Sequence, residues 1–217
     1  MKSAAVFLAL ISVLVSTCAI AQTDSEPETD PLKERLGVRI GYAWTPNDLS
    51  EAFGAGMSLS LHFMQRIKKP FGVDVSIGAI YLGETEKDIR FPDFTTEFYD
   101  KVSMRIFMLT AAPMVEFATS DRTSYFVSIG GGFYAATLLL DQEFEELDLT
   151  NDYFGMTVNA GVTHRIFTNW FVDLGLNLHK FWTPDNPEEV DWVYLFSGGD
   201  SDPLFWAITA GIALRLF

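Results

Sequence analysis

Cysteine and long apolar runs are both nearly missing from this chain of 217 residues. The only cysteine is Cys18, and it lies in an N-terminal segment that we expect to be removed. The remaining chain then has no disulfide and no cysteine metal site. Beyond that segment, no apolar run reaches the roughly 18 residues that suggest a membrane-spanning helix. The sequence therefore excludes a helical membrane protein and a domain held together by disulfides.

Positive charge is also scarce. The chain has 15 lysine and arginine residues against 29 aspartate and glutamate residues, which gives a net charge of −14. Nucleic acid is therefore excluded as a partner, because its recognition needs a basic surface. Aromatic residues, in contrast, make up 14% of the chain. Membrane β-barrels use such residues in girdles at both membrane interfaces, so this composition favours a barrel.

The N-terminus has the pattern of a secretion signal. A lysine at position 2 precedes the apolar run Val6–Val15, and small residues at positions 19 and 21 fit a cleavage site. We expect residues 1–21 to be a signal peptide, residues 22–33 to be a flexible acidic periplasmic segment, and residues 34–217 to be one barrel domain. Lipoprotein processing at Cys18 is the alternative, although the preceding threonine is bulkier than that processing prefers.

Strict alternation of apolar and polar residues is clearest between Tyr153 and Phe181. Two runs alternate in this way, on either side of a turn at residues 167–169, and their apolar members are Phe154, Met156, Val158, Ala160 and Val162, then Val172, Leu174, Leu176 and Leu178. A period of two places all apolar side chains on one face of a sheet. Because no amphipathic helix is left to cover that face, the pattern predicts a closed barrel whose apolar face contacts lipid.

The same alternation predicts eight antiparallel strands in an up-and-down transmembrane barrel. The other six cover about residues 36–44, 56–65, 73–82, 101–117, 124–138 and 204–217. The connections after the second, fourth and sixth strands are short, whereas the others, including 83–100 and 139–152, are longer and acidic. Such asymmetry is typical of short periplasmic turns and long external loops. In the fourth strand we expect Val102 and Met104 to face lipid and Arg105 to face inward, with a bulge near Pro113.

Ionisable residues occupy several of the predicted inward positions. They are Arg39, His62, Asp74, Arg105, Asp173, His179 and Arg215. An eight-stranded barrel is just wide enough for side chains to fill it, so we interpret this set as a structural network of ion pairs in the lumen. A narrow conduit or a small buried site is the alternative. Strand adjacency suggests an ion pair between Asp173 and Arg215.

The chain resembles the small eight-stranded outer-membrane β-barrel proteins. The resemblance rests on the eight strands, on residues 112–117 (APMVEF) followed by 125–134 (YFVSIGGGFY), and on the C-terminal Phe217. These small barrels include the OmpA membrane domain, OmpX and OmpW. The two quoted segments look most like the group called outer membrane protein beta-barrel domain. The resemblance covers roughly residues 34–217 and implies an outer-membrane location. It also implies that Phe217 is read by the barrel-insertion machinery. The sequence departs from the family pattern at Arg215, because the position two residues before the end is usually apolar.

Three functional hypotheses follow. The first is a structural or surface-interaction protein that presents acidic extracellular loops, and the second is a conduit for small solutes or hydrophobic compounds, as in OmpW. The third is a lipid-modifying enzyme such as a lipid A deacylase, whose pattern is His-x-Ser-Asn. None of His62, His164 and His179 is followed by that serine. We therefore predict no enzyme activity, no catalytic residue and no cofactor, and we expect a monomer in contact with outer-membrane lipids. Divalent cations at acidic loops such as 185–202 remain possible partners.

Overall fold

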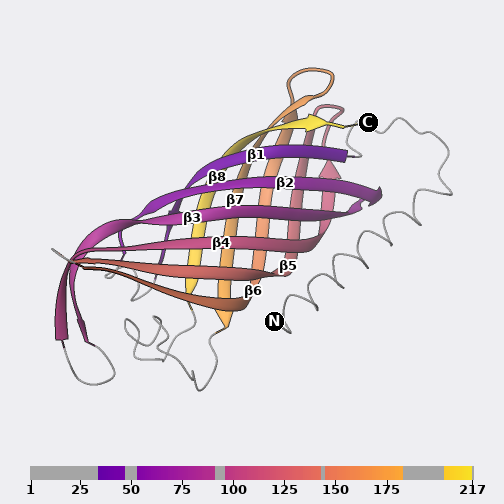
Figure 1. Cartoon of the computed structure of the whole chain (residues 1–217). Helices are drawn as coiled ribbons and strands as arrows, with labels where there is room; N and C mark the ends of the chain where they lie inside the picture. Colours follow the sequence, from indigo (N-terminus) through magenta and orange to yellow (C-terminus); the bar gives the residue numbers. More distant parts are fainter. Residues whose placement is uncertain (1–33, 47–52, 91–95, 143–144, 183–202, 217) are drawn as a thin grey trace.

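The eight predicted strands are present and close into one barrel (Figure 1). The computed structural model describes residues 34–46, 53–90, 96–142, 145–182 and 203–216. The strands are β1 (Glu34–Trp44), β2 (Gly56–Lys68), β3 (Phe71–Arg90), β4 (Thr96–Ala118), β5 (Thr123–Gln142), β6 (Glu145–Arg165), β7 (Trp170–Trp182) and β8 (Leu204–Arg215). Each pairs antiparallel with its neighbour in the chain, and β8 closes the barrel on β1. Among the described residues there is no helix long and apolar enough to cross a membrane.

The two ends of the barrel differ. One end, called the turn end here, carries the short connections β2–β3, β4–β5 and β6–β7, together with the start of β1 and the finish of β8. The opposite end is called the hairpin end. There β3, β4, β5 and β6 run on for 20 to 23 residues, whereas the other four strands have 11 to 13. Figure 1 shows these four long strands extending well past the closed wall.

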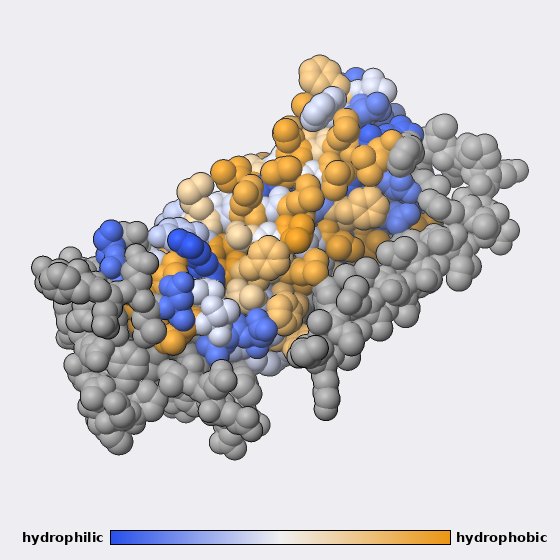
Figure 2. Space-filling model, viewed as in Figure 1, coloured by the Kyte–Doolittle hydropathy of each residue, from blue (hydrophilic) through white to orange (hydrophobic). Residues whose placement is uncertain are grey.

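The outer wall is apolar along most of its height, as the alternation predicts. Figure 2 shows this apolar band on the visible face, with hydrophilic surface at both ends. The exposed apolar side chains include Val38, Ile40, Met57, Leu59, Leu61, Ile77, Val127, Ile129, Leu174, Leu176, Ile208 and Ile212. A water-soluble protein rarely exposes a contiguous apolar surface of this kind. The prediction that the apolar face points outward is thus confirmed for β1, β2, β3, β6, β7 and β8.

The orientation predicted for β4 is wrong. Val102, Met104, Ile106 and Met108 face the interior and are buried, whereas Arg105 and Phe107 face outward and are exposed. The prediction assumed that apolar side chains always point to lipid. In this segment the interior of the barrel is itself apolar, so the pattern is that of a water-soluble sheet, with its apolar side chains inward.

Two of the predicted loops are largely strand. Most of residues 83–100 belongs to β3 and β4, which pair with each other as far as Arg90 and Thr96. Residues 139–152 belong to β5 and β6 except for positions 143–144, and Gln142 pairs with Glu145. The prediction missed these segments because their acidic composition resembles that of a loop. Charged residues are tolerated there because a strand outside a membrane can expose polar side chains to water.

The bulge predicted at Pro113 does not form. Ala111 pairs with Gly131 and Met114 pairs with Ser128, so the pairing of β4 with β5 keeps one register on both sides of the proline. Pairing on the other side continues through Val73 and Pro113. Proline lacks only one donor, and the ladder is interrupted toward β5 at this point without a shift. The unbroken register keeps Glu116, further along β4, on the inner face.

Candidate functional site

The interior near the turn end is polar, and its centre is the carboxylate of Glu116. Arg35 and Arg66 each place a guanidinium nitrogen 2.8 Å from this carboxylate, on separate oxygens. The Ser124 hydroxyl donates a hydrogen bond to the same group. Four strands, β1, β2, β4 and β5, therefore meet at one buried carboxylate. The exposed fractions of Glu116, Arg35 and Arg66 are 3%, 1% and 5%, so the charges have almost no access to solvent.

A second buried group lies around Asp173. Arg39 is 3.5 Å and His62 is 3.4 Å from its carboxylate oxygens. The predicted partner was Arg215, and that pairing is wrong: the cross-strand neighbour of Asp173 is Gly211. Arg215 lies at the end of β8, partly exposed, where its backbone N–H donates to the carbonyl of Asn169. The prediction placed the two residues on adjacent strands but could not fix their relative height.

The remaining interior polar residues predicted from the sequence join hydrogen-bond networks. Asp74 lies 3.5 Å from the Ser128 hydroxyl and 3.4 Å from the side-chain amide nitrogen of Asn159. His179 lies 3.1 Å from the Tyr134 hydroxyl. Of the seven predicted inward residues, five are buried inside the barrel (Arg39, His62, Asp74, Asp173 and His179), and Arg105 faces outward. Arg215 follows the buried Ala213 by two residues and so shares its inward face, but it is partly exposed at the end of β8.

Sequence reasoning missed the residues that form the Glu116 centre. Arg35 fell before the predicted start of the first strand, and Arg66 fell in a predicted turn. Glu116 was not assigned a direction, because a bulge at Pro113 would have changed its orientation. Glu116 lies on the same face as Met104, so unbroken alternation from the predicted outward direction of Met104 would have placed Glu116 outside. Only the observed inward direction of Met104 places it inside, where a buried carboxylate requires positive partners.

The interior changes character toward the hairpin end, where it becomes an apolar plug. The plug consists of Ala43, Phe53, Ile80, Leu82, Val102, Met104, Ile106, Met108, Tyr134, Ala136, Leu138, Leu140, Tyr153, Phe181, Phe205 and Ala207. Within it, Phe181 packs against Phe205, Tyr134 and Tyr153 at centroid distances of 4.9, 4.5 and 5.7 Å. Ions do not cross such a layer readily because it offers them no polar partners.

Glycines on the inner wall make space for large interior side chains. A side chain at Gly161 would place its Cβ 2.7 Å from the Phe126 ring, and one at Gly155 would lie 2.9 Å from the Tyr134 ring. Phe126 in turn lies under the Arg39 guanidinium, 5.1 Å from the ring centroid. The width of the barrel is thus used fully by side chains, as is typical for eight strands.

The interior does not assemble the groups needed for nucleophilic catalysis in the described part of the chain. Ser76 is the cross-strand neighbour of His62, but its hydroxyl is hydrogen-bonded to Thr110 at 2.8 Å. His62 instead faces Asp173. A nucleophilic serine needs a base within hydrogen-bond distance, and neither His62 nor His179 holds a serine in this way among the contacts of residues 34–216 that are described.

Aromatic side chains form two belts on the outer wall. The belt near the hairpin end contains Tyr42, Tyr81, Phe107, Phe154 and Trp182, and the belt near the turn end contains Phe71, Phe117, Tyr125, Phe167 and Trp170. Ten residues separate Phe107 from Phe117 along β4. With a rise of about 3.4 Å per residue and a tilt of about 40°, the belts lie about 26 Å apart. This separation matches the apolar thickness that membrane barrels present to lipid.

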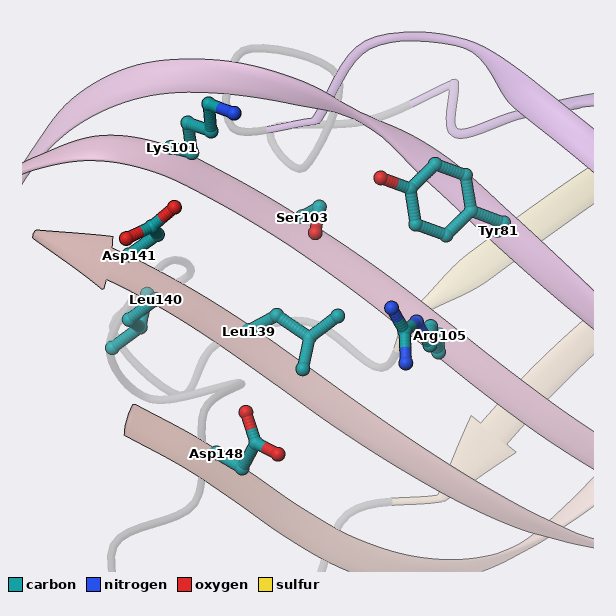
Figure 3. Close-up of a pocket in the computed structure, with 8 residues that line it drawn as sticks. All are labelled: Tyr81, Lys101, Ser103, Arg105, Leu139, Leu140, Asp141 and Asp148. Atoms are coloured by element: carbon teal, nitrogen blue, oxygen red, sulfur yellow. The ribbon is translucent and has the colours of Figure 1, made fainter. Parts of the chain in front are cut away.

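A cavity of about 240 Å³ opens on the outer wall beside the aromatic belt near the hairpin end (Figure 3). Its lining is Tyr81, Lys101, Ser103, Arg105, Leu139, Leu140, Asp141 and Asp148, from β3, β4, β5 and β6. Figure 3 shows the Tyr81 hydroxyl pointing toward Ser103, with Lys101 and Arg105 on either side of this serine along β4. This pocket, called the wall pocket here, gathers several hydrogen-bond donors.

Several predicted features lie outside the described residues. They are the signal peptide and acidic segment (residues 1–33), the C-terminal Phe217, and the acidic loop 185–202 that could hold divalent cations. Within the described ranges, no group of three or more histidine, cysteine, aspartate or glutamate side chains is placed to hold a metal ion.

Comparison with solved structures identifies the fold. The neisserial surface protein A matches with a TM-score of 0.53 and 11% identity, over 84% of this chain and 96% of that protein. Ail of Yersinia pestis matches with 0.47 and 15%, over 84% and 99%, and OprG of Pseudomonas aeruginosa with 0.48 and 10%, over 85% and 97%.

No family model and no curated protein matches the sequence. At this level of identity the first of the structural matches supports the fold alone. These structural neighbours are outer-membrane β-barrels, and this chain has the same fold, a closed eight-stranded antiparallel barrel.

Proposed function

We propose that the protein resides in the outer membrane and binds other proteins through a sheet that projects from the barrel. The single observation that carries this proposal is the extension of β3, β4, β5 and β6 past the closed wall. Pairing of β2 with β3 stops at Met57 and Tyr81, and pairing of β6 with β7 stops at Phe154 and Trp182. Beyond these points the four long strands pair only with one another in the described part of the chain.

The projecting sheet has two edges, residues 82–90 of β3 and residues 145–153 of β6. Neither segment has a strand on its outer side among the described residues. An edge strand offers a row of backbone N–H and C=O groups that an extended peptide can pair with. These edges therefore suit β-strand addition by a partner.

Charge narrows the class of partner. The outward positions of β5 and β6 in the sheet include Asp141, Asp148 and Asp152, and the Thr137 and Thr150 hydroxyls are hydrogen-bonded at 2.9 Å on the same face. Like charges repel at contact, and opposite charges steer association. We infer that the partner is a positively charged extended segment of another protein, in accordance with the acidic surface predicted from the sequence.

The apolar plug favours a binding role over a conduit. An ion or polar solute entering from the turn end would meet Tyr134, Phe181 and Phe205, all of which are fully buried. Purified protein in a planar bilayer is expected to give no stepwise conductance. Reproducible single-channel steps would contradict this part of the proposal and would support the conduit instead.

Proline substitution at two consecutive edge residues tests the binding edge. In a strand, successive N–H groups point to opposite sides, so of Thr150 and Asn151 one directs its N–H toward β5 and the other toward the open side. Proline removes that donor. One of Thr150→Pro and Asn151→Pro should therefore keep the ladder to β5 but abolish binding, whereas the other should disturb the sheet.

The probe is a phage-displayed library of short peptides, selected on the intact barrel in detergent. Intact protein should enrich basic peptides with high β-propensity. The proline variant that keeps its pairing with β5 should bind these peptides at least about tenfold more weakly. Asp148→Lys should also weaken the same peptides, because it reverses one charge of the surface. If intact protein enriches no peptides, or if neither proline variant reduces their binding, the proposed edge is not the binding site.

A further inference from the structure

Arg105 occupies an unusual position on the outer wall. It lies two residues beyond Phe107, a member of the aromatic belt near the hairpin end, and points away from the interior. Its cross-strand neighbours are Tyr81 on β3 and Thr137 on β5, neither of which is charged. Lys101, in contrast, lies opposite Asp141. The positive charge of Arg105 is thus not matched by an acidic residue at its own height on either neighbouring strand.

The wall pocket surrounds Arg105 with further donors. Ser103, the next outward residue of β4, lines the pocket floor and is only 6% exposed. The Tyr81 hydroxyl points toward it (Figure 3). A guanidinium and two hydroxyl groups are the donors that hold phosphate oxygens in proteins, and arginine can do so with two parallel N–H bonds. The chemistry of the pocket therefore fits a phosphate group.

The height of the pocket fits the headgroup layer of a lipid. Two residues along a tilted strand correspond to about 5 Å, and six residues to about 15 Å. Arg105 is therefore about 5 Å beyond the belt and Lys101 about 15 Å beyond it. Aromatic belts mark the boundary between hydrocarbon and headgroups, so a phosphate next to that boundary would lie beside Arg105.

We propose that the wall pocket binds the phosphate of a lipid headgroup in the outer leaflet. Arg105, Ser103 and Tyr81 donate to the phosphate oxygens, and Lys101 lies further out beside the polar part of the headgroup. The proposal rests on the membrane location proposed above. A lipid is favoured over a soluble anion for two reasons. The pocket opens sideways on the wall, where lipids are at high local concentration, and the net charge of −14 repels dissolved anions.

The acidic residues of the pocket limit the kind of headgroup. Asp141 and Asp148 line the side formed by β5 and β6, away from Arg105 on β4. Carboxylates accept hydrogen bonds from hydroxyl or ammonium groups. The pocket therefore suits a phosphate that carries a hydroxyl-rich or amine-bearing substituent, and it disfavours a second phosphate on the acidic side.

The test compares lipids that differ only in phosphate. Full-length mature protein is placed in micelles of a phosphate-free maltoside detergent that contain a minor fraction of either phosphatidic acid or diacylglycerol, and native mass spectrometry counts the lipids that stay bound. Phosphatidic acid should be retained and diacylglycerol should not. Arg105→Gln should lower that retention roughly tenfold, because it removes a charge-assisted hydrogen bond. Arg105→Lys should restore part of it.

Arg122 provides the matched control. It is an exposed arginine in the turn between β4 and β5, at the opposite end of the barrel, so Arg122→Gln removes the same charge without touching the pocket. Its phosphatidic acid retention should equal that of the unchanged protein. An equal loss in both variants would mean that only net charge matters, and would overturn the proposed site.

Two further measurements are needed. One distinguishes lipid phosphate from free phosphate as the ligand, and the other distinguishes failure of the lipid site from failure of the proposed peptide-binding edge. Inorganic phosphate titrated into protein in neutral detergent should give no binding heat, whereas tight binding would overturn the assignment to a lipid. All variants should stay folded and inserted, as judged by heat-dependent mobility on gels. Inserted protein that retains phosphatidic acid and diacylglycerol equally would refute the lipid site while leaving the peptide-binding edge untouched.

Discussion

Replacement of Glu116 tests how much the buried ion cluster stabilises the barrel. Its carboxylate accepts hydrogen bonds from Arg35 and Ser124 and forms an ion pair with Arg66, and all four side chains are at most 5% exposed. Glu116→Ala leaves two buried guanidinium groups without their carboxylate. Breaking a buried pair in this way typically costs about 3–5 kcal/mol, because the remaining charge is neither solvated nor compensated. We expect a loss in the free energy of unfolding at the upper end of that range, since two cations are affected.

The measurement is urea unfolding of the protein from lipid vesicles, followed by tryptophan fluorescence. Asp121, an exposed carboxylate in the turn between β4 and β5, is the control, and Asp121→Ala should change stability by no more than about 0.5 kcal/mol. A triple variant, Arg35→Met with Arg66→Met and Glu116→Leu, removes every charge of the cluster at once. It should be more stable than Glu116→Ala, because no charge is left unpaired.

Two results would refute this reasoning. A cost below about 1 kcal/mol for Glu116→Ala would mean that water reaches the arginines and screens them. A triple variant less stable than Glu116→Ala would mean that the packing of the long side chains, and not charge pairing, provides the stabilisation.

Further predictions concern the packing of the interior. Gly161→Val should destabilise the barrel by about 1–3 kcal/mol in the same urea assay, because its Cβ would lie 2.7 Å from the Phe126 ring. Gly131→Ala, on the outer wall, is its control and should lower the free energy of unfolding far less. Tyr134→Phe should cost about 1 kcal/mol through loss of the hydrogen bond to His179, and an unchanged urea midpoint would show that this contact does not form.

The fold could be predicted from the sequence because the barrel obeys a simple rule between the two belts. In the proposed membrane location the outside there is hydrocarbon, which explains why an apolar side chain such as Leu59 or Leu174 points out and a polar one such as His62 or Asp173 points in. Eight strands, their order and the direction of six of them follow from period-two alternation alone. The interior positions of Arg39 and Asp74 follow from the same rule.

The rule that apolar side chains point outward failed in the part of β4 where the interior of the barrel is apolar. Beyond the aromatic belt near the hairpin end, the proposed location makes the outside aqueous, and the interior is the apolar plug, so Met104 points in and Arg105 points out. A sequence does not state at which residue a strand leaves the membrane, and the reversal therefore has no local signal. Partners within the lumen, such as Arg35 for Glu116, could not be predicted either, because they depend on the relative heights of strands that are distant in the chain.

The most direct test of the account is a scan of single cysteines along β4, made in a background without Cys18. A spin label at each position from Ser103 to Phe117 reports its exposure to oxygen, which dissolves in lipid, and to a water-soluble nickel complex. Odd positions from Phe107 to Phe117 should be accessible to oxygen and even positions to neither reagent, whereas a label at the exposed Arg105 should be accessible to the nickel complex. Oxygen access at even positions, or no alternation at all, would contradict a closed barrel with a filled interior.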